Sequence, residues 1–182
     1  MRNLSIALSL SLLTLFSCGG GETETTTDEV LTIPGYVDLD LSEYGYELVI
    51  QVPGEDQGLP EVNETSFGKI EIRVGKMFGI EIADGPGDFA LLKSDLDGDL
   101  VYKSKILAED STHIIYEREI PDSGIDTEYH FFYVANIKDR GRYEIQNLKD
   151  EFYSKTAVEK MLEASKTLRA KKPGEVIGEP AV

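Results

Sequence analysis

Seven segments between residues 46 and 148 have the composition of β-strands, and short turns separate most of them; apolar and polar residues alternate clearly in 46–52, 68–74 and 77–83. The segments are residues 46–52, 68–74, 77–83, 100–109, 112–120, 127–137 and 142–148. Alternation with a period of two is typical of a β-strand that buries one face. Strands that are joined by short turns pair antiparallel. The sequence therefore predicts a mainly antiparallel sheet of about six to seven strands.

Two other segments have the spacing of a helix. In residues 88–97, apolar residues recur every three or four positions behind Asp88, a residue type that favours the N-cap position. A second helix is predicted to begin at Ser154 or at Thr156 and to continue until Pro173 stops it. The expected fold class is thus α+β, with a short helix and a C-terminal helix packed on the sheet.

Two strands are expected to occupy different places in the sheet. Residues 127–137 are apolar on both faces, which is typical of a strand inside a sheet that is covered on both sides. Residues 142–148 are polar on one face. The second strand is therefore predicted nearer an edge.

The amino terminus has the form of a secretory signal peptide. One basic residue precedes an apolar stretch that is too short to remain as a membrane-spanning helix. The stretch ends in "LFSC", which resembles a bacterial lipobox, with residues 1–17 as the signal peptide and Cys18 as the first mature residue. The resemblance implies lipid attachment at Cys18, cleavage before it, and a bacterial outer membrane location on the periplasmic or the cell-surface face.

The remaining chain divides into three parts. Residues 18–35 are rich in glycine, threonine and acids, and are expected to form a flexible acidic tether. The acidic stretch resembles the surface-export signals of Bacteroidetes-type lipoproteins, and it equally fits a plain linker. Residues 36–172 are expected to form a single domain, and residues 173–182 a disordered tail.

Charge and cysteine content exclude several classes of function. The chain carries 18 Lys and Arg against 34 Asp and Glu, a formal net charge of -16, which opposes binding to nucleic acid. The single cysteine allows no internal disulfide and no zinc cluster. The expected partner is the membrane, through the lipid, together with an unidentified protein or small molecule, and the chain is expected to be a monomer.

The segment "DLDGDL" has some of the features of a calcium loop. Asp95, Asp97 and Asp99 match the first acidic positions of an EF-hand loop. Leu100 and Ile106 stand where that loop needs glycine and a bidentate glutamate. We therefore expect a solvated turn here and no metal site.

The two histidines are predicted to lie apart. If the turn at 121–127 joins its strands symmetrically, His113 faces Ala135 and His130 faces Arg118. A structural role is expected for each histidine, and the sequence predicts no cofactor and no catalytic residue.

Four blocks of the chain resemble a family of small, uncharacterised Bacteroidetes lipoproteins. These blocks are "VDLDLSEYGYELVIQVPG", "DFALLKSDL", "IIYEREI…YHFFYV" and "FYSKTAVEKMLEASKTL". The layout is also similar to PsbP-like sandwiches, at the level of the fold alone. The resemblance implies a lipoprotein and assigns no functional residues.

Three functions remain open at this point. The first is a non-enzymatic, lipid-anchored envelope domain that binds a partner or supports the outer membrane. The second is a small-ligand carrier with a pocket between helices and sheet, near Phe89, Phe132 and Met161. The third and least favoured is a hydrolase with dispersed acidic residues.

Overall fold

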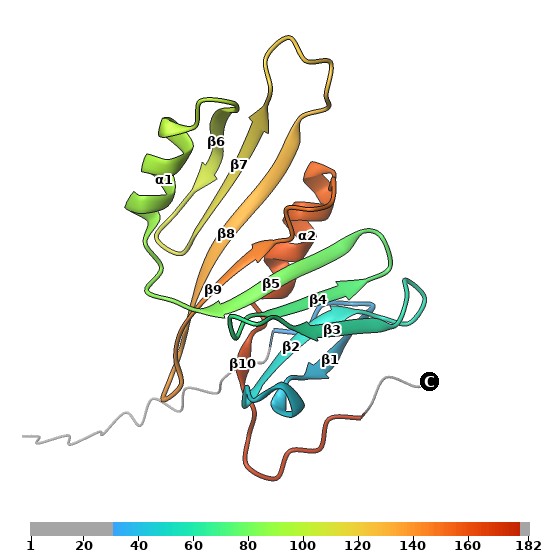
Figure 1. The fold of residues 1–182 in the computed structure, drawn as a ribbon. Coiled ribbons are helices and arrows are strands. Elements are labelled where there is room, and N and C mark those ends of the chain that lie inside the picture. Colours follow the sequence, from blue (N-terminus) through green and yellow to red (C-terminus); the bar gives the residue numbers. More distant parts are fainter. Residues whose placement is uncertain (1–30, 179–182) are drawn as a thin grey trace, which may run out of the picture.

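The structure is a computed structural model that describes residues 31–178. Within this range the chain forms a seven-stranded sheet, a three-stranded sheet and two α-helices (Figure 1). All neighbouring strands of both sheets pair antiparallel. The predicted α+β class is therefore confirmed. The predicted signal peptide, Cys18 and most of the predicted tether lie outside the described residues.

The large sheet contains strands from the middle of the chain. In chain order these are β3 (Pro60–Glu64), β4 (Ile70–Val74), β5 (Phe78–Asp84), β6 (Lys103–Glu109), β7 (His113–Glu119), β8 (Glu128–Ile137) and β9 (Gly141–Asn147). Their order across the sheet is β3-β4-β5-β9-β8-β7-β6. The helix α1 (Phe89–Gly98) connects β5 to β6, and α2 (Lys155–Ser165) follows β9.

The small sheet joins the two ends of the domain. Its strands are β1 (Tyr36–Asp40), β2 (Leu48–Pro53) and β10 (Arg169–Ala170), in the order β1-β2-β10. A short 3-10 turn, η1 (Ser42–Tyr44), lies between β1 and β2. All six residues of β2 are buried. The chain segment after α2 thus returns to pair with the start of the domain.

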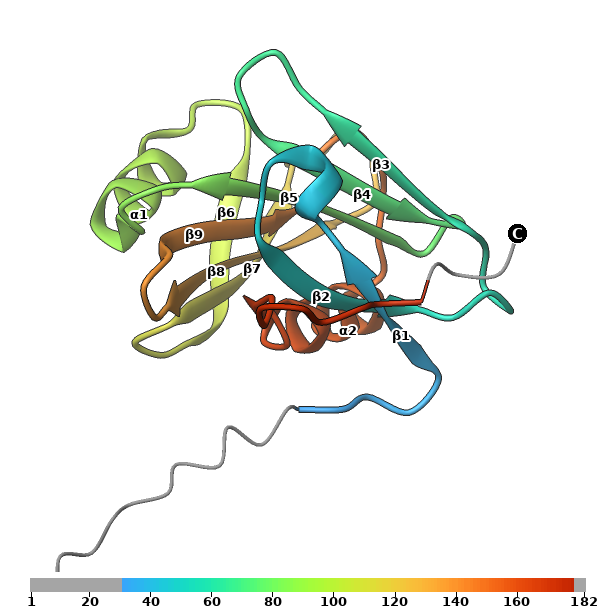
Figure 2. The same ribbon diagram turned by 90° about the horizontal axis from the view of Figure 1, so that it is seen from below.

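The main core lies on one face of the large sheet, where α2 and the small sheet lie close together (Figure 2). Alternate residues of β4 and β5 point into this core, among them the fully buried Ile72 and Ile80. The helix contributes a buried stripe that consists of Ala157, Val158, Met161, Leu162, Ala164 and Ser165. Burial of such apolar stripes is the dominant stabilising contribution to a fold of this kind.

The opposite face of the sheet is covered only in part. Phe131 belongs to the main core, so its neighbour Phe132 points to the other face. There the Phe132 ring packs edge-on against Phe89 of α1, with ring centroids 5.4 Å apart. α1 contacts β6 and lies at the β6–β8 end of the sheet (Figure 1). None of its residues is buried, so it forms a thin cover.

Both predicted helix starts are confirmed. The side chain of Asp88 accepts a hydrogen bond from the Leu91 backbone N–H at 2.9 Å, as an N-cap residue does. Ser154 caps α2 in the same way, through the Ala157 N–H at 3.2 Å. Of the two starts left open for the second helix, Ser154 is therefore the right one.

The predicted end of the second helix is wrong. α2 ends at Ser165, and Arg169–Ala170 forms β10 in place of a last helical turn. The buried hydroxyl of Thr167 accepts a hydrogen bond from the Gln51 N–H of β2 at 2.8 Å, which draws the chain away from the helix axis. Arg169 then forms ion pairs with Asp38 at 2.9 Å and with Glu175 at 2.8 Å. The positive charge of Arg169 thus pairs with carboxylates and does not stabilise the C-terminal end of a helix.

Two short strands, β1 and β3, are absent from the sequence-based prediction. β1 buries one residue of five and β3 buries none. Strands with so few buried positions leave little alternation in the sequence. Their place is set by their partners, because β1 pairs with the buried β2 and β3 pairs with β4.

The prediction for β9 is also wrong, whereas that for β8 is confirmed. β8 lies inside the sheet between β9 and β7, with the main core on one face and α1 on the other. β9 was expected near an edge and lies in the middle of the sheet. Its polar residues Glu144 and Gln146 point to the incompletely covered face. A polar side of a strand therefore marks an open face here, not an edge.

Candidate functional site

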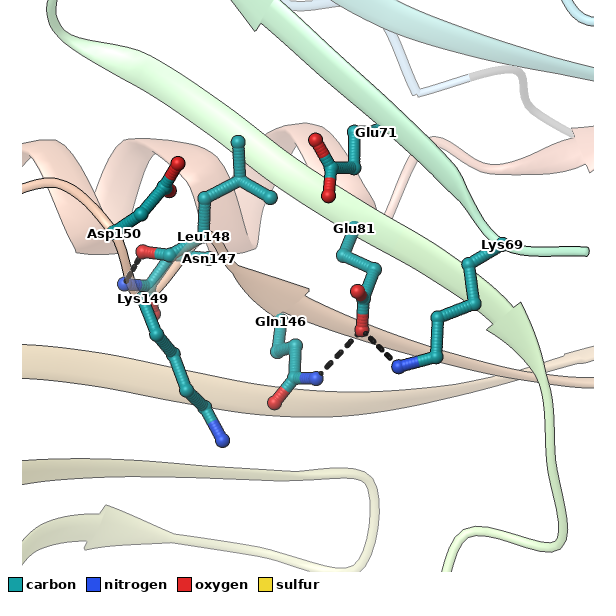
Figure 3. Close-up of a pocket in the computed structure, with 8 residues that line it drawn as sticks. All are labelled: Lys69, Glu71, Glu81, Gln146, Asn147, Leu148, Lys149 and Asp150. Atoms are coloured by element: carbon teal, nitrogen blue, oxygen red, sulfur yellow. Dashed lines mark hydrogen bonds and ion pairs between the residues drawn. The ribbon is translucent and has the colours of Figure 1, made fainter. Parts of the chain in front are cut away.

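An open groove of about 390 Å³ lies at the centre of the large sheet, on the face that carries α1 (Figure 3). It is lined by residues of three neighbouring strands, by the residue just before β4 and by the segment after β9. These residues are Lys69, Glu71, Glu81, Gln146, Asn147, Leu148, Lys149 and Asp150. The groove is predominantly polar, which distinguishes it from the apolar core on the other face.

Strand register brings the polar residues of the groove together. Glu71 of β4 lies opposite Glu81 of β5, and Glu81 lies opposite Gln146 of β9. Because side chains alternate along a strand, the isoleucines between these positions point into the core. Two like charges directly opposite each other destabilise a sheet. Each glutamate therefore needs a partner of its own.

All three carboxylates of the groove have cationic partners. Glu81 accepts hydrogen bonds from Lys69 Nζ at 2.9 Å and from Gln146 Nε2 at 2.8 Å (Figure 3). Glu71 accepts from Arg73 Nη1 at 2.6 Å, and Asp150 accepts from Arg73 Nη2 at 2.9 Å. Carboxylates that are fixed by cationic partners in this way are suited to binding a polar ligand.

Lys149 is the groove cation without such a partner. Among the described residues, its ammonium group forms no hydrogen bond and no ion pair, and the residue is exposed. Its pKa is lowered, first by partial burial of the ammonium group and then by the positive charge of Arg118. Glu81 and Asp95 act in the opposite direction. An anionic group placed beside Lys149 would offset both unfavourable effects.

Asn147 forms the buried floor of the groove and joins β9 to β8. It is 1% exposed. Its Oδ1 accepts a hydrogen bond from the Phe131 N–H at 3.0 Å. Its Nδ2 donates to Leu148 O at 3.1 Å and lies 3.1 Å from His130 Nδ1. At the end of β9, the Asn147 side chain thus forms hydrogen bonds with backbone groups of β8 and of Leu148, in place of backbone pairing between the two strands.

A buried network continues from Asn147 beneath the sheet surface. His130 Nε2 lies 3.3 Å from Glu128, which also accepts a hydrogen bond from Arg118 at 3.1 Å. Burial lowers the pKa of His130, so the ring is neutral at pH 7. A proton on Nε2 then lets Nδ1 accept from Asn147. The guanidinium of Arg118 lies 3.9 Å from the ring centre of Tyr102.

The predicted register of the two histidines needs correction. His113 pairs with Tyr133, not with Ala135, and His130 pairs with Tyr116, not with Arg118. The loop between β7 and β8 is therefore not symmetric about the centre that we assumed.

The histidines are separated, and His113 has a partner of its own. Its Nδ1 lies 3.0 Å from Asp110. The hydrogen bond from the Thr112 N–H, followed by those from the Thr112 hydroxyl and the His113 N–H, lowers the pKa of Asp110 to about 2. His113 thus belongs to the β6–β7 turn and takes no part in the groove.

The structure brings together two of the three predicted pocket residues. Phe89 and Phe132 are in contact, as described above. Met161 is fully buried in α2 on the opposite face of the sheet, where its sulfur accepts a hydrogen bond from the Gly79 N–H at 3.3 Å. None of the three lines the polar groove. Cys18, the predicted lipid attachment site, lies outside the described residues.

The groove residues were not predicted as a site from the sequence. Their signal is the polar half of each alternating segment, namely Lys69 and Glu71, then Glu81, then Gln146. Glu81 and Gln146 are 65 residues apart in the sequence, and only the pairing of β5 with β9 makes them neighbours. Finding the groove from the sequence would therefore have required the strand order.

The described residues contain no arrangement that indicates a metal centre or a membrane span. No group of three or more His, Cys, Asp or Glu residues in 31–178 is placed to hold a metal ion. Over the same range, no helix is long and apolar enough to cross a bilayer. No family model matches the chain, and neither a curated protein nor a solved structure matches it.

Proposed function

We propose that this protein is a lipid-anchored lipoprotein of the bacterial outer membrane, with a non-catalytic binding domain. The proposed anchor is a diacylglyceryl group on Cys18. The lipobox-like "LFSC" and the lone cysteine at its end support this assignment. Two acyl chains attach a protein stably, because each buried CH₂ contributes about 0.8 kcal/mol.

The observation that carries the binding role is the polar groove. Of the large sheet's two faces, one is occupied by α2 and the small sheet, and the other by α1 at one end only. The groove at its centre exposes charged and amide groups from β4, β5 and β9. Its carboxylates are held by Lys69 and Arg73, which favours recognition of a ligand over proton transfer.

Membrane fractionation tests the anchor. Cys18→Ala removes the thiol that would carry the lipid, so the variant is expected to move from the membrane fraction to the soluble fraction. It is also expected to lose incorporation of radiolabelled palmitate. Ser17→Ala is the matched control, because it keeps a small residue before the cysteine and should remain anchored. Sedimentation of Cys18→Ala with membranes, at the wild-type level, would show that the anchor is misassigned.

Proteolysis of intact cells then decides which face the domain occupies. If the tether exports the domain to the cell surface, protease added to whole cells removes it. If the domain faces the periplasm, it survives until the outer membrane is permeabilised. Either outcome is compatible with the anchor, and the two distinguish a sorting role of the acidic tether from a plain linker.

A further inference from the structure

The charges of the groove are unequally distributed between its two ends. At one end, Arg73 is shared by Glu71 and Asp150 and lies 3.6 Å from Glu151 as well. One guanidinium therefore faces three carboxylates, and this end is negative. At the other end is the unpaired ammonium of Lys149, whose side chain extends away from Glu71 and Asp150 (Figure 3). The groove is thus negative at one end and positive at the other.

We propose that the groove binds a small zwitterion, a short peptide with free ends, whose carboxylate contacts Lys149 and whose ammonium contacts Glu71 and Asp150. This proposal rests on the binding role proposed above and names the class of ligand. Gln146 lies between the two ends, and its Nε2 already donates to Glu81. Its carbonyl oxygen points toward the side of Lys149 (Figure 3) and can accept a hydrogen bond from a peptide N–H.

The charge of the whole chain favours a zwitterion over a simple anion. A formal net charge of -16 repels small anions at long range. A simple cation would satisfy the carboxylate end and add to the positive charge around Lys149, where Arg118 and Lys69 already act. A zwitterion has no net charge and places each of its groups beside the opposite sign. It also offsets the cost of the unpaired Lys149 ammonium.

The size of the groove limits the length of the ligand. A volume of about 390 Å³ lies near the lower bound for sites that bind small molecules. An extended peptide spans at most about 3.3–3.6 Å for each residue. A groove of this volume suits a peptide of two or three residues, and this is the ligand length that we propose.

Titration with triglycine, followed by amide NMR signals, tests the proposal. The probe is added to the detergent-solubilised full-length protein, and signals of Gln146 and Lys149 are expected to shift in a saturable manner. N-acetyltriglycine and triglycine amide each lack one terminal charge. Each is expected to bind at least about tenfold more weakly, a difference of about 1.4 kcal/mol. Equal affinity of all three probes, or no shift in the groove, would overturn the proposal.

A pair of lysine variants locates the carboxylate contact. Lys149→Met should weaken triglycine binding at least about tenfold, since it removes the one cation without a partner among the described residues that line the groove. Lys160→Met is the matched control, because Lys160 is exposed on α2 and lies outside this groove. Unchanged binding by Lys149→Met would also overturn the proposal. Triglycine binding does not depend on Cys18. If triglycine does not bind but Cys18→Ala is released from the membrane, the ligand proposal is wrong and the anchor assignment stands.

Discussion

Replacement of Asn147 by alanine should cost more stability than any other removal of a polar side chain from the groove. Asn147 is buried, and its amide partners are the Phe131 N–H and the His130 Nδ1 atom. Alanine leaves both groups buried and unpaired. Each such group costs about 1–3 kcal/mol, which gives an expected loss of about 2–6 kcal/mol. Typical domains have only about 5–15 kcal/mol of stability in total.

Urea unfolding provides the measurement, with tyrosine fluorescence and far-ultraviolet circular dichroism as probes because the chain has no tryptophan. Asn136→Ala is the matched control, since Asn136 lies on β8 and is exposed. Its loss is expected to be within about 0.5 kcal/mol of zero. If Asn147→Ala loses less than about 1 kcal/mol relative to this control, Asn147 is not the link between β8 and β9 that we describe.

Three further predictions concern other parts of the domain and use the same unfolding measurement. Gly79→Ala should cost about 1–3 kcal/mol, because a Cβ at this position would lie 2.1 Å from the Tyr153 hydroxyl. Gly98→Ala, at the last residue of α1, meets no atom within 4 Å and should change stability by no more than about 0.5 kcal/mol. A loss equal to that of Gly79→Ala would refute the packing argument. Burial holds the pKa of His130 below its unfolded value of about 6.5, so the folded form binds fewer protons, and stability should fall as the pH drops below about 6.5. His130→Gln should remove that part of the pH dependence, and an unchanged slope would contradict it. Arg169→Met should cost about 1–2 kcal/mol through the loss of two carboxylate partners, and no loss would mean that β10 is held by its backbone alone.

Local features of the fold were predictable because their causes are local. Alternation identified the strands that bury one whole face, such as β4 and β5, since the core imposes a period of two on them. Asp88 identified the start of the first helix, and Ser154 was one of two candidates for the second, because capping depends on residues within one turn. The two apolar faces of residues 127–137 placed the strand that became β8 (Glu128–Ile137) inside the sheet for the same reason.

Features that depend on distant partners were not predictable in the same way. The end of α2 depends on the hydrogen bond between Thr167 and Gln51, which are 116 residues apart. β10 depends on the ion pairs that its Arg169 and the following Lys171 form with Asp38 and Asp40 of β1. In the sequence, the same positive charges equally fit the end of a helix. Local pattern alone does not separate these two outcomes.

The groove follows from the size of the sheet relative to the elements that cover it. Seven strands spaced about 4.8 Å apart extend over roughly 29 Å. A single helix is about 10–12 Å wide and covers about two strands. On one face, α2 and the small sheet together are wide enough to bury β4, β5 and β9. Among the described elements, the other face is covered by α1 alone. The side chains that β4, β5 and β9 direct to this face must therefore be polar, because apolar ones would expose a large apolar surface. The polar side of β9 is therefore a consequence of incomplete cover, and a ligand on Gln146 and Lys149 would occupy the space that no helix fills.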